Sequence, residues 1–311
     1  PAAAPGADGG ARGGAVEAAV RRAEAVEDER SSVVLCRLAG SDARSSVTVR
    51  LQPTTNTRSL VFDDDVAGVE TRAQCHGAAP QECLGGAGAG TVQEVSGCMA
   101  CACAGSAGRV YGPYAREMAE DIDRRCQGGR SEEGPLRVLL IGLGGGELAI
   151  HLAQRCGARL ALDAVEYDGR LPELASRYFG LPPSVKVLVG DALPVVESLR
   201  RGVEENRLLG DERRYDVVLV DCFSTGGVTP EHCRSPEFVG AARALLRGGG
   251  AVLQHLWHED SQHPEVARDY AATLAAYRAA FACQNCSVAA RALPGGPDGI
   301  VSASQPASGQ E

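Results

Sequence analysis

The segment from Arg137 to Asp168 constrains the fold more than any other part of this chain. It begins with an apolar run, 138–141, of the kind that forms a strand covered on both faces of a parallel sheet. Four glycines follow directly: Gly142, Gly144, Gly145 and Gly146. A helical pattern over 147–156 and a second apolar run over 160–165 come next. This order predicts a strand–turn–helix–strand unit of an α/β fold.

Glu166 ends the second predicted strand and makes this unit a candidate for nucleotide binding. Glycines let the backbone turn tightly and approach a ligand closely, and an acid in this position can accept hydrogen bonds from ribose hydroxyls. The turn alone would be weak evidence, because the chain has 39 glycines. The strand before it and the acid after it favour nucleotide binding over a bare structural turn.

The spacing of the glycines separates two classes of ligand. A dinucleotide fingerprint, G-x-G-x-x-G, needs a third glycine at position 147, where the chain has Glu147. An acid in the first helical turn would also repel a pyrophosphate. The chain instead has G-x-G-x-G through Gly142, Gly144 and Gly146, which favours S-adenosylmethionine (AdoMet) as the cofactor.

Composition narrows the function further. The chain has 311 residues, 44% of them hydrophobic, enough for a proper core in one large or two modest domains. Its net charge of −9 lacks the basic character that nucleic-acid binding requires, but it allows a basic protein substrate.

No apolar run approaches the ~20 residues of a membrane span, so we expect no membrane partner. Because the chain begins at Pro1, we expect an upstream segment, with any targeting signal, to be missing from the sequence.

Twelve cysteines are many for this length. They could indicate an oxidising compartment, but a chain of this size can bury a core without disulfides. The expectation is therefore a cytoplasmic enzyme in which most cysteines are small buried hydrophobic residues. Cys283 and Cys286 could be a redox pair, but they lack a thioredoxin-like context.

The chain divides into five expected regions: a disordered and helical extension (1–30), a small antiparallel β-region (31–71), a Gly/Ala/Cys-rich insertion (72–108), the AdoMet-binding domain (109–305) and a tail (306–311). In the insertion, Cys98 and Cys101 could bind zinc with Cys75 and Cys83, but no second C-x-x-C lies nearby. Three consecutive acids, 63–65, suit a hairpin turn better than a metal site, since neighbouring side chains on a turn diverge. We therefore predict no metal.

Strands and helices alternate from position 137 onward. Before this region, a helix is expected over 110–126. Within it, helices are expected over 193–208, 236–246 and 264–281, strands over 185–189, 215–220 and 251–256, and a turn over 248–250. Strands over 287–293 and 300–304 should form a closing antiparallel pair. The predicted fold class is α/β, with a Rossmann-like, mostly parallel sheet, a terminal antiparallel hairpin and a small N-terminal β-region. Ligands of such sheets bind beyond the carboxyl ends of the strands, where Glu166, Asp191 and Asp221 fall.

The run from Leu136 to about Gln305 resembles class I methyltransferases of the spermidine-synthase-like branch. Within that branch it is most similar to the C-terminal domain of the elongation-factor-1-alpha lysine and N-terminal methyltransferase. The resembling segments are IGLGGGEL, DAVEYD, ASRYFGL, VGDALPVVESL, YDVVLVD and CRSPEFV. Upstream, RSLVFDDDVAGVETR and YGPYAREM resemble the small β-region and the lead-in helix of the branch, whereas the insertion has no counterpart.

The resemblance implies a role for each matching residue. Gly142, Gly144 and Gly146 would line the methionine and ribose end of AdoMet. Glu166 would hold the ribose hydroxyls, Tyr167 would lie beside the adenine, and Asp191 with Ala192 would meet the adenine amino group. Asp221 would face the sulfonium and the incoming nucleophile, where a carboxylate can orient an amine or accept its proton.

Two departures from the family separate methyl transfer from aminopropyl transfer. Spermidine synthases carry an acid in the glycine turn where this chain has Gly145, and D-x-x-D-P where this chain continues from Asp221 with Cys-Phe-Ser-Thr. A diamine needs at least two carboxylates to bind and orient it, so methyl transfer is favoured. The D/N-P-P-Y/F motif of amide-nitrogen methyltransferases is also missing.

The favoured function is therefore AdoMet-dependent methylation of a protein amine, either a lysine or an N-terminus. The alternatives are a polyamine aminopropyltransferase and a non-catalytic scaffold of the same fold. Substrate-side residues are expected over 222–230 and 256–260 and around Tyr111 and Tyr114. His255 and His258, just past the fifth predicted strand, could accept a proton. A homodimer is compatible with the sequence.

Overall fold

The computed structural model describes residues 32–40, 45–63, 69–77, 98–99, 101–103, 105, 108–110, 112–128, 134–205, 214–224, 228–258, 264–294 and 296–307. The expected disordered and helical extension (1–30), two of the three consecutive acids (64 and 65), Cys83 and Tyr111 lie outside these residues.

The small N-terminal sheet has four antiparallel strands in sequential order: β1 (Val33–Leu38), β2 (Val47–Gln52), β3 (Thr57–Phe62) and β4 (Val69–Gln74). The predicted small β-region is thereby confirmed. Strand β4 extends past position 71, because Gln74 still pairs with Thr57 of β3. The prediction that the unpaired insertion starts at Arg72 is therefore wrong, since polar residues without an apolar alternation concealed the end of the strand.

The large sheet has seven strands in the order β10-β11-β9-β8-β5-β6-β7. Their bounds are β5 (Leu136–Ile141), β6 (Leu160–Glu166), β7 (Lys186–Val189), β8 (Tyr215–Val220), β9 (Leu246–Trp257), β10 (Ser287–Ala292) and β11 (Asp298–Ser304). The five strands from β5 to β9 pair in parallel, and β11 runs antiparallel between β9 and β10. The predicted fold class is confirmed, including the terminal hairpin.

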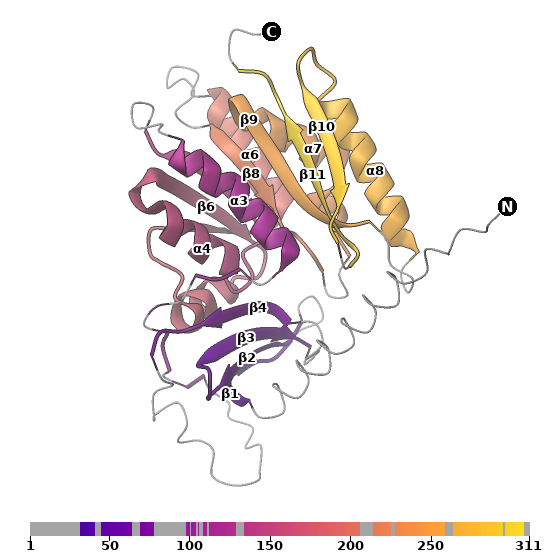
Figure 1. The fold of residues 1–311 in the computed structure, drawn as a ribbon. Coiled ribbons are helices and arrows are strands. Elements are labelled where there is room, and N and C mark those ends of the chain that lie inside the picture. The colour runs from indigo at the N-terminus through magenta and orange to yellow at the C-terminus, as the bar shows by residue number, and fades with distance from the viewer. Residues whose placement is uncertain are drawn as a thin grey trace, which may run out of the picture.

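Helices cover both faces of the large sheet (Figure 1). One face carries α3 (Pro113–Gln127), α4 (Glu147–Cys156) and α5 (Leu171–Leu174), which continues into a π-helical turn at Ala175–Phe179. The other face carries α6 (Ala192–Glu205), α7 (Pro236–Ala244) and α8 (Glu265–Ala280). Along β5, Val138 and Leu140 join the first core while Leu139 and Ile141 join the second. This explains the wholly apolar strand sequence, because both faces are buried.

Strand β9 is longer than its sequence indicates. The three glycines at 248–250, predicted to be a turn before the strand, lie within β9, and a register shift against β8 falls between Tyr215 and Val217. The long strand also contains His255, which pairs with Ile300 of β11. The placement of His255 just past the strand is therefore wrong: the predicted bounds 251–256 already include it, and pairing with β11 continues the strand to Trp257.

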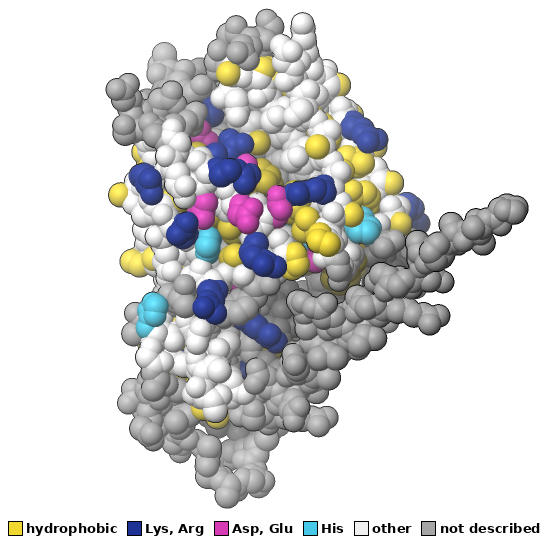
Figure 2. Space-filling view, viewed as in Figure 1, with side chains coloured by type: hydrophobic (Ala, Val, Ile, Leu, Met, Phe, Trp, Pro, Cys, Tyr) yellow, Lys and Arg dark blue, Asp and Glu magenta, His cyan; other side chains and the backbone are white. Residues whose placement is uncertain are grey.

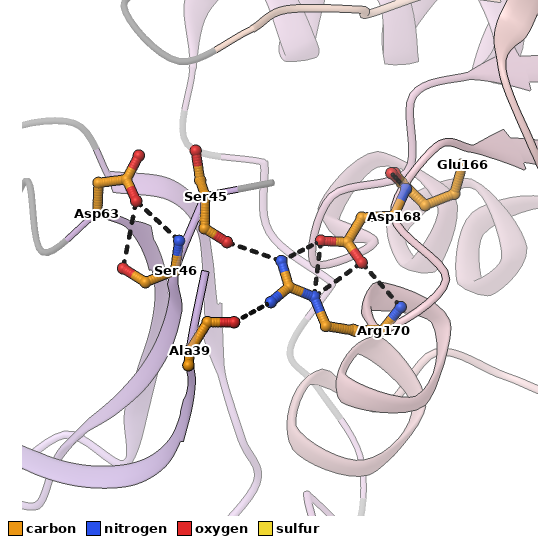
Figure 3. A network of polar contacts seen from close by, with 7 residues as sticks. All are labelled: Ala39, Ser45, Ser46, Asp63, Glu166, Asp168 and Arg170. Carbon is orange, nitrogen blue, oxygen red and sulfur yellow. Dashed lines mark hydrogen bonds and ion pairs between the residues drawn. The ribbon is translucent and has the colours of Figure 1, made fainter. Parts of the chain in front are cut away.

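Two arginines connect the small sheet to the large one. Arg58 of β3 is fully buried and donates to the carbonyl oxygens of Cys101 and Tyr178, at 2.8 and 3.1 Å. Arg170 donates to the carbonyl oxygens of Ala39 and Ser45, both at 2.7 Å, and also binds the carboxylate of Asp168 (Figure 3). Because charged side chains hold both contacts, the small sheet has a fixed position beside the glycine turn.

Asp63 lies at the end of β3 and caps the neighbouring strand. Its carboxylate accepts a hydrogen bond from the backbone N–H of Ser46 at 2.7 Å (Figure 3). Hydrogen bonds from Ser45 and Ser46 lower the pKa of Asp63. Asp63, the one of the three consecutive acids that the structure describes, therefore forms local hydrogen bonds at the strand end.

The cysteines form disulfides, and none of those described is free. The pairs are Cys36–Cys98, Cys75–Cys103, Cys126–Cys156, Cys222–Cys233 and Cys283–Cys286, and Cys101 is also disulfide-bonded. The expectation that most cysteines are merely small buried residues is therefore wrong. Three of these pairs join cysteines 28 to 62 residues apart, which spacing alone did not reveal, whereas Cys283 and Cys286 are the C-x-x-C pair that the spacing suggests. The four cysteines considered as zinc ligands cannot bind zinc together, because two of them, Cys98 and Cys75, form disulfides with Cys36 and Cys103.

No helix among the described residues is long and apolar enough to cross a membrane. On the face shown in Figure 2, basic and acidic side chains are interspersed over the large sheet and its helices, and no continuous basic area stands out.

Candidate functional site

The predicted site residues lie along one edge of the large sheet. Strands β5, β6, β7 and β8 are parallel neighbours, and the register sets Ile141 beside both Val165 and Val220. Glu166 is the last residue of β6, the glycine turn and Asp221 directly follow β5 and β8, and Gly190 separates Asp191 from the end of β7. The strand order therefore gathers groups as far apart in the sequence as Gly142 and Asp221.

The glycine turn has a backbone that only glycine adopts readily. Gly142, Gly144 and Gly146 have φ values of +90°, +54° and +85°. The backbone N–H of Gly142 donates to Val165 at 2.9 Å, and that of Asp221 donates to Ile141 at 2.8 Å. These bonds hold the turn between two neighbouring strand ends.

Thr71 of β4 packs against the glycine turn. Its Oγ1 accepts a hydrogen bond from the backbone N–H of Gly145 at 2.9 Å. A Cβ atom on Gly145 would lie 2.6 Å from the Thr71 Cγ2 atom, which is closer than real contacts allow. Nearby, the carboxylate of Glu147 accepts from the backbone N–H of Arg72 at 3.3 Å. The small sheet therefore forms one wall of the turn.

Glu166 is buried and binds the turn directly. Its Oε2 accepts from the backbone N–H groups of Leu143 and Gly144, at 3.0 and 3.1 Å, and its Oε1 accepts from Asp168 at 2.8 Å. Burial raises the pKa of Glu166, and the three N–H groups offset this only in part. Three of the roughly four acceptor positions of a carboxylate are therefore used by the backbone, which leaves one open.

The residues predicted to surround the adenine lie further along the same edge. Tyr167 follows β6 and is 50% exposed, unusual for so large an apolar side chain. Asp191 accepts a hydrogen bond from the backbone N–H of Leu193, and its Oδ2 lies 3.8 Å from His232 Nδ1. Ala192 is buried at the start of α6. The tyrosine ring and the partly exposed Asp191 carboxylate are thus both accessible to a ligand.

Asp221 belongs to a row of three side chains. Its Oδ1 lies 3.0 Å from Nδ1 of His255, and Nε2 of the same ring lies 2.8 Å from Oδ1 of Asp298. His255 is only 3% exposed, whereas both aspartates are partly exposed. Burial lowers the pKa of His255, but the hydrogen bonds and charges of the two aspartates outweigh it, so the pKa is raised.

Aromatic rings surround this row. The Tyr114 ring stacks on the His255 ring with centroids 3.7 Å apart and planes 8° from parallel. The Phe223 ring lies 4.6 Å from His255 and 6.1 Å from Trp257. All three aromatic residues are partly exposed. The surface beside Asp221 therefore combines carboxylate oxygens with aromatic rings.

A disulfide closes the segment that follows Asp221. Cys222 pairs with Cys233, which joins the start of this segment to the 3₁₀ turn Glu231–Cys233 before α7. Among the described residues, these two cysteines and His232 form a group with metal-binding donor types, but the disulfide uses both sulfurs.

Sequence reasoning missed Thr71 and Asp298. Thr71 lay at the end of the predicted β-region, and Asp298 lay in a Pro/Gly turn, where an acid is unremarkable. Thr71 reaches the site because β4 packs against the turn after β5, and Asp298 reaches it because β11 pairs with the end of β9. A predicted antiparallel pairing of β11 with β9 would have been the signal for Asp298, because that pairing brings residue 298 opposite Trp257.

No family model matches the chain. The chain is 31% identical over 147 residues to a polyamine aminopropyltransferase of Vibrio vulnificus, covering 47% of this chain and 43% of that protein. It is 34% identical over 113 residues to the human eEF1A lysine and N-terminal methyltransferase, covering 34% of this chain and 15% of that protein. The chain therefore spans less than half the length of these curated relatives.

Solved structures show the same fold. Human methyltransferase-like protein 13, crystallised with S-adenosylhomocysteine (SAH), is 25% identical with a TM-score of 0.50, over 65% of this chain and 85% of that one. A probable spermidine synthase of Corynebacterium glutamicum is 18% identical with a TM-score of 0.57, over 88% of this chain and 80% of that one.

The sheet order, the glycine turn and these similarities define a methyltransferase-type Rossmann-like fold. The resemblance to the spermidine-synthase-like branch is confirmed, since the relatives of this chain include a protein methyltransferase and an aminopropyltransferase.

Proposed function

We propose that this chain is an AdoMet-dependent methyltransferase that methylates an amine of a protein. The observation that carries this proposal is the glycine turn, with Glu166, Asp191 and Asp221 along one strand edge. The similarity to a lysine and N-terminal methyltransferase, and to a structure crystallised with SAH, supports the same assignment.

The residues present fit AdoMet. A side chain on Gly142 would collide with the Asp221 backbone, so the close approach of the turn to the end of β8 requires glycine at this position. Glu166 keeps one acceptor position for a ribose hydroxyl, Asp191 offers a carboxylate for the adenine amino group, and Tyr167 offers a ring face. When bound, AdoMet supplies a methyl group already activated on a sulfonium.

Gly145 supports methyl transfer over aminopropyl transfer. Spermidine synthases resemble this chain but carry an acid at this position, which suits a cofactor with a free amine and no carboxylate. Here a Cβ atom would lie 2.6 Å from Thr71 Cγ2, and the Gly145 N–H already binds Thr71 Oγ1. An acid would therefore require Thr71 to move. The turn therefore has room for glycine at position 145 and lacks room for an acidic side chain there.

The groups beside Asp221 support an amine as acceptor. A carboxylate attracts and orients an ammonium or amine, and aromatic faces attract cations. Asp221 supplies the carboxylate, and the partly exposed rings of Tyr114 and Phe223 supply the aromatic faces. In this assignment the chain's residues align the amine and exclude water while the methyl group is transferred in line.

A scaffold without activity is the remaining alternative, and Phe223 is the residue that could block the site. Its ring lies against His255 and remains partly exposed, so it borders the carboxylate rather than enclosing it. This arrangement favours an accessible site over a blocked one.

The decisive experiment combines binding with methylation. Titration calorimetry with AdoMet, its decarboxylated form and SAH should give binding of AdoMet and SAH in preference to the decarboxylated form. Proteins incubated with the enzyme and isotope-labelled AdoMet should then carry labelled methyl groups on amines, detected by mass spectrometry. Asp191→Ala should abolish AdoMet binding, whereas Asp163→Ala, on the same sheet beside Tyr215, should retain it. No AdoMet or SAH binding at millimolar ligand would overturn the proposal.

The disulfides support an oxidising compartment in place of the expected cytoplasm. Five pairs join described residues, and disulfides persist mainly in oxidising compartments. Alkylation of the protein from its native cells, followed by mass spectrometry without reduction, should recover disulfide-linked peptides. Fully alkylated cysteines would contradict this assignment. The protein acceptor would then lie in the same compartment.

A further inference from the structure

The row Asp221–His255–Asp298 has a fixed direction of hydrogen bonding. Each nitrogen of the His255 ring faces a carboxylate oxygen, at 3.0 and 2.8 Å. An ionised carboxylate only accepts hydrogen bonds, so with both aspartates ionised the two ring nitrogens both donate and the ring carries a positive charge. A neutral imidazole has only one donor nitrogen and would leave the other facing an acceptor.

The surroundings preserve this charge. His255 is nearly excluded from water, and among the described residues the titratable groups that face it are Asp221 from the end of β8, Asp298 from β11 and Tyr114 from α3. The Tyr114 ring lies parallel to the imidazole, which adds a favourable contact between an aromatic face and a cation. Each aspartate is only partly exposed, so solvent screens the row weakly.

We infer that His255 and Asp298 are positioning residues for Asp221, which they hold as an oriented anion beside the acceptor amine. This inference rests on the proposed methyltransferase function. His255 occupies Oδ1 of Asp221, so the carboxylate is held in one orientation and its other oxygen is left to orient the amine. His255 has no free lone pair, so it cannot act as the general base that its sequence position suggested.

Asp298 completes the arrangement and is the residue to change. It lies at the start of β11, which β9 and β8 separate from β5 and its glycine turn, and its carboxylate binds His255. Replacing it should therefore alter catalysis without altering AdoMet binding. Asp163 is a matched control, because its carboxylate also accepts one hydrogen bond at 2.8 Å and is similarly exposed (20% against 22%).

The first test compares Asp298→Ala and Asp298→Asn with the same substitutions at Asp163. With a synthetic peptide that has a lysine and a free N-terminus, Asp298→Ala should lower kcat about tenfold or more. The calorimetric Kd for SAH should stay within twofold. Asp298→Asn keeps an acceptor oxygen but loses the charge, so kcat/KM should gain a pH-dependent step near the ordinary histidine pKa of about 6.5. Equal kcat values and unchanged pH profiles for the Asp298 and Asp163 variants would overturn the inference.

The second test does not depend on activity or on a variant that folds. Nitrogen-15 NMR of the intact wild-type protein at pH 7.5 should show both ring nitrogens of His255 protonated, with the signals assigned through His255→Gln. A neutral, single-tautomer ring would overturn the inference even in an active enzyme. If the wild type binds no AdoMet, the proposed function fails, while the NMR result still decides the protonation of the row.

Discussion

The backbone carbonyl oxygen of Asp221 lies only 2.0 Å from the position that a Cβ atom would occupy on Gly142. The turn that would hold the cofactor and the strand end that would hold the acceptor are therefore in direct backbone contact. Because neither can shift without the other, this contact fixes the relative position of the two halves of the site.

Gly142→Ala should destabilise the protein strongly. The substitution adds a side chain at φ +90° and places it against backbone, which cannot rotate away. We expect a loss of more than about 2 kcal/mol in the free energy of unfolding, with loss of AdoMet binding. Gly240→Ala in α7 is the control, because its Cβ would meet nothing within 4 Å, and chemical denaturation should show unchanged or slightly higher stability. Equal effects of the two substitutions would refute the assigned contact.

Gly145 and Thr71 should be energetically coupled. Gly145→Ala forces a Cβ atom against Thr71 Cγ2, and Thr71→Ser removes that methyl group while keeping the hydroxyl that binds the Gly145 N–H. A double-mutant cycle of unfolding free energies should give a favourable coupling of about 0.5–3 kcal/mol. Strict additivity would show that the small sheet does not pack on the turn as described.

Glu166→Gln should weaken both the fold and AdoMet binding. The amide has one acceptor oxygen, so the N–H groups of Leu143, Gly144 and Asp168 cannot all keep a partner. Each buried N–H left unpaired costs about 1–3 kcal/mol. Denaturant titration and calorimetry should show both losses, whereas Glu173→Gln, an exposed position in α5, should show neither. Normal AdoMet affinity in Glu166→Gln would remove this residue from the cofactor site.

His255 should contribute a pH-dependent part of the stability. Its folded-state pKa is raised above the ordinary 6.5, so its contribution is fully present below that value and is lost as the pH rises through the folded pKa. The difference in unfolding free energy between wild type and His255→Gln should therefore shrink from pH 6 toward alkaline pH. Urea unfolding at several pH values measures this difference, and a constant difference would contradict the charged row.

Disulfide contributions should follow the length of chain that each pair closes. Cys126–Cys156 closes a separation of 30 residues and Cys283–Cys286 a separation of 3. Because a longer loop loses more entropy in the unfolded state, the double serine variant at 126 and 156 should lose about 2–4 kcal/mol and the variant at 283 and 286 less. Thermal unfolding with and without reductant checks this ranking. If the reductant leaves the wild-type melting temperature unchanged, these disulfides are not stabilising the fold.

The sequence by itself determined the large sheet and the edge at which the candidate site residues gather. Apolar runs of strand length, separated by helical patterns, permit few arrangements other than a parallel sheet with covered faces. The position of glycines and acids at the ends of those runs then assigns the binding edge, because parallel strands end on one side.

Tertiary structure decided what surrounds that edge. The Cys36–Cys98 disulfide, the contact of Thr71 with Gly145 and the approach of Asp298 to His255 all join residues far apart in the chain. Periodicity and spacing report only which face of its own element a residue occupies. Contacts between elements depend on how those elements pack, so Asp298 appeared in the sequence as a turn residue and in the fold as part of the site.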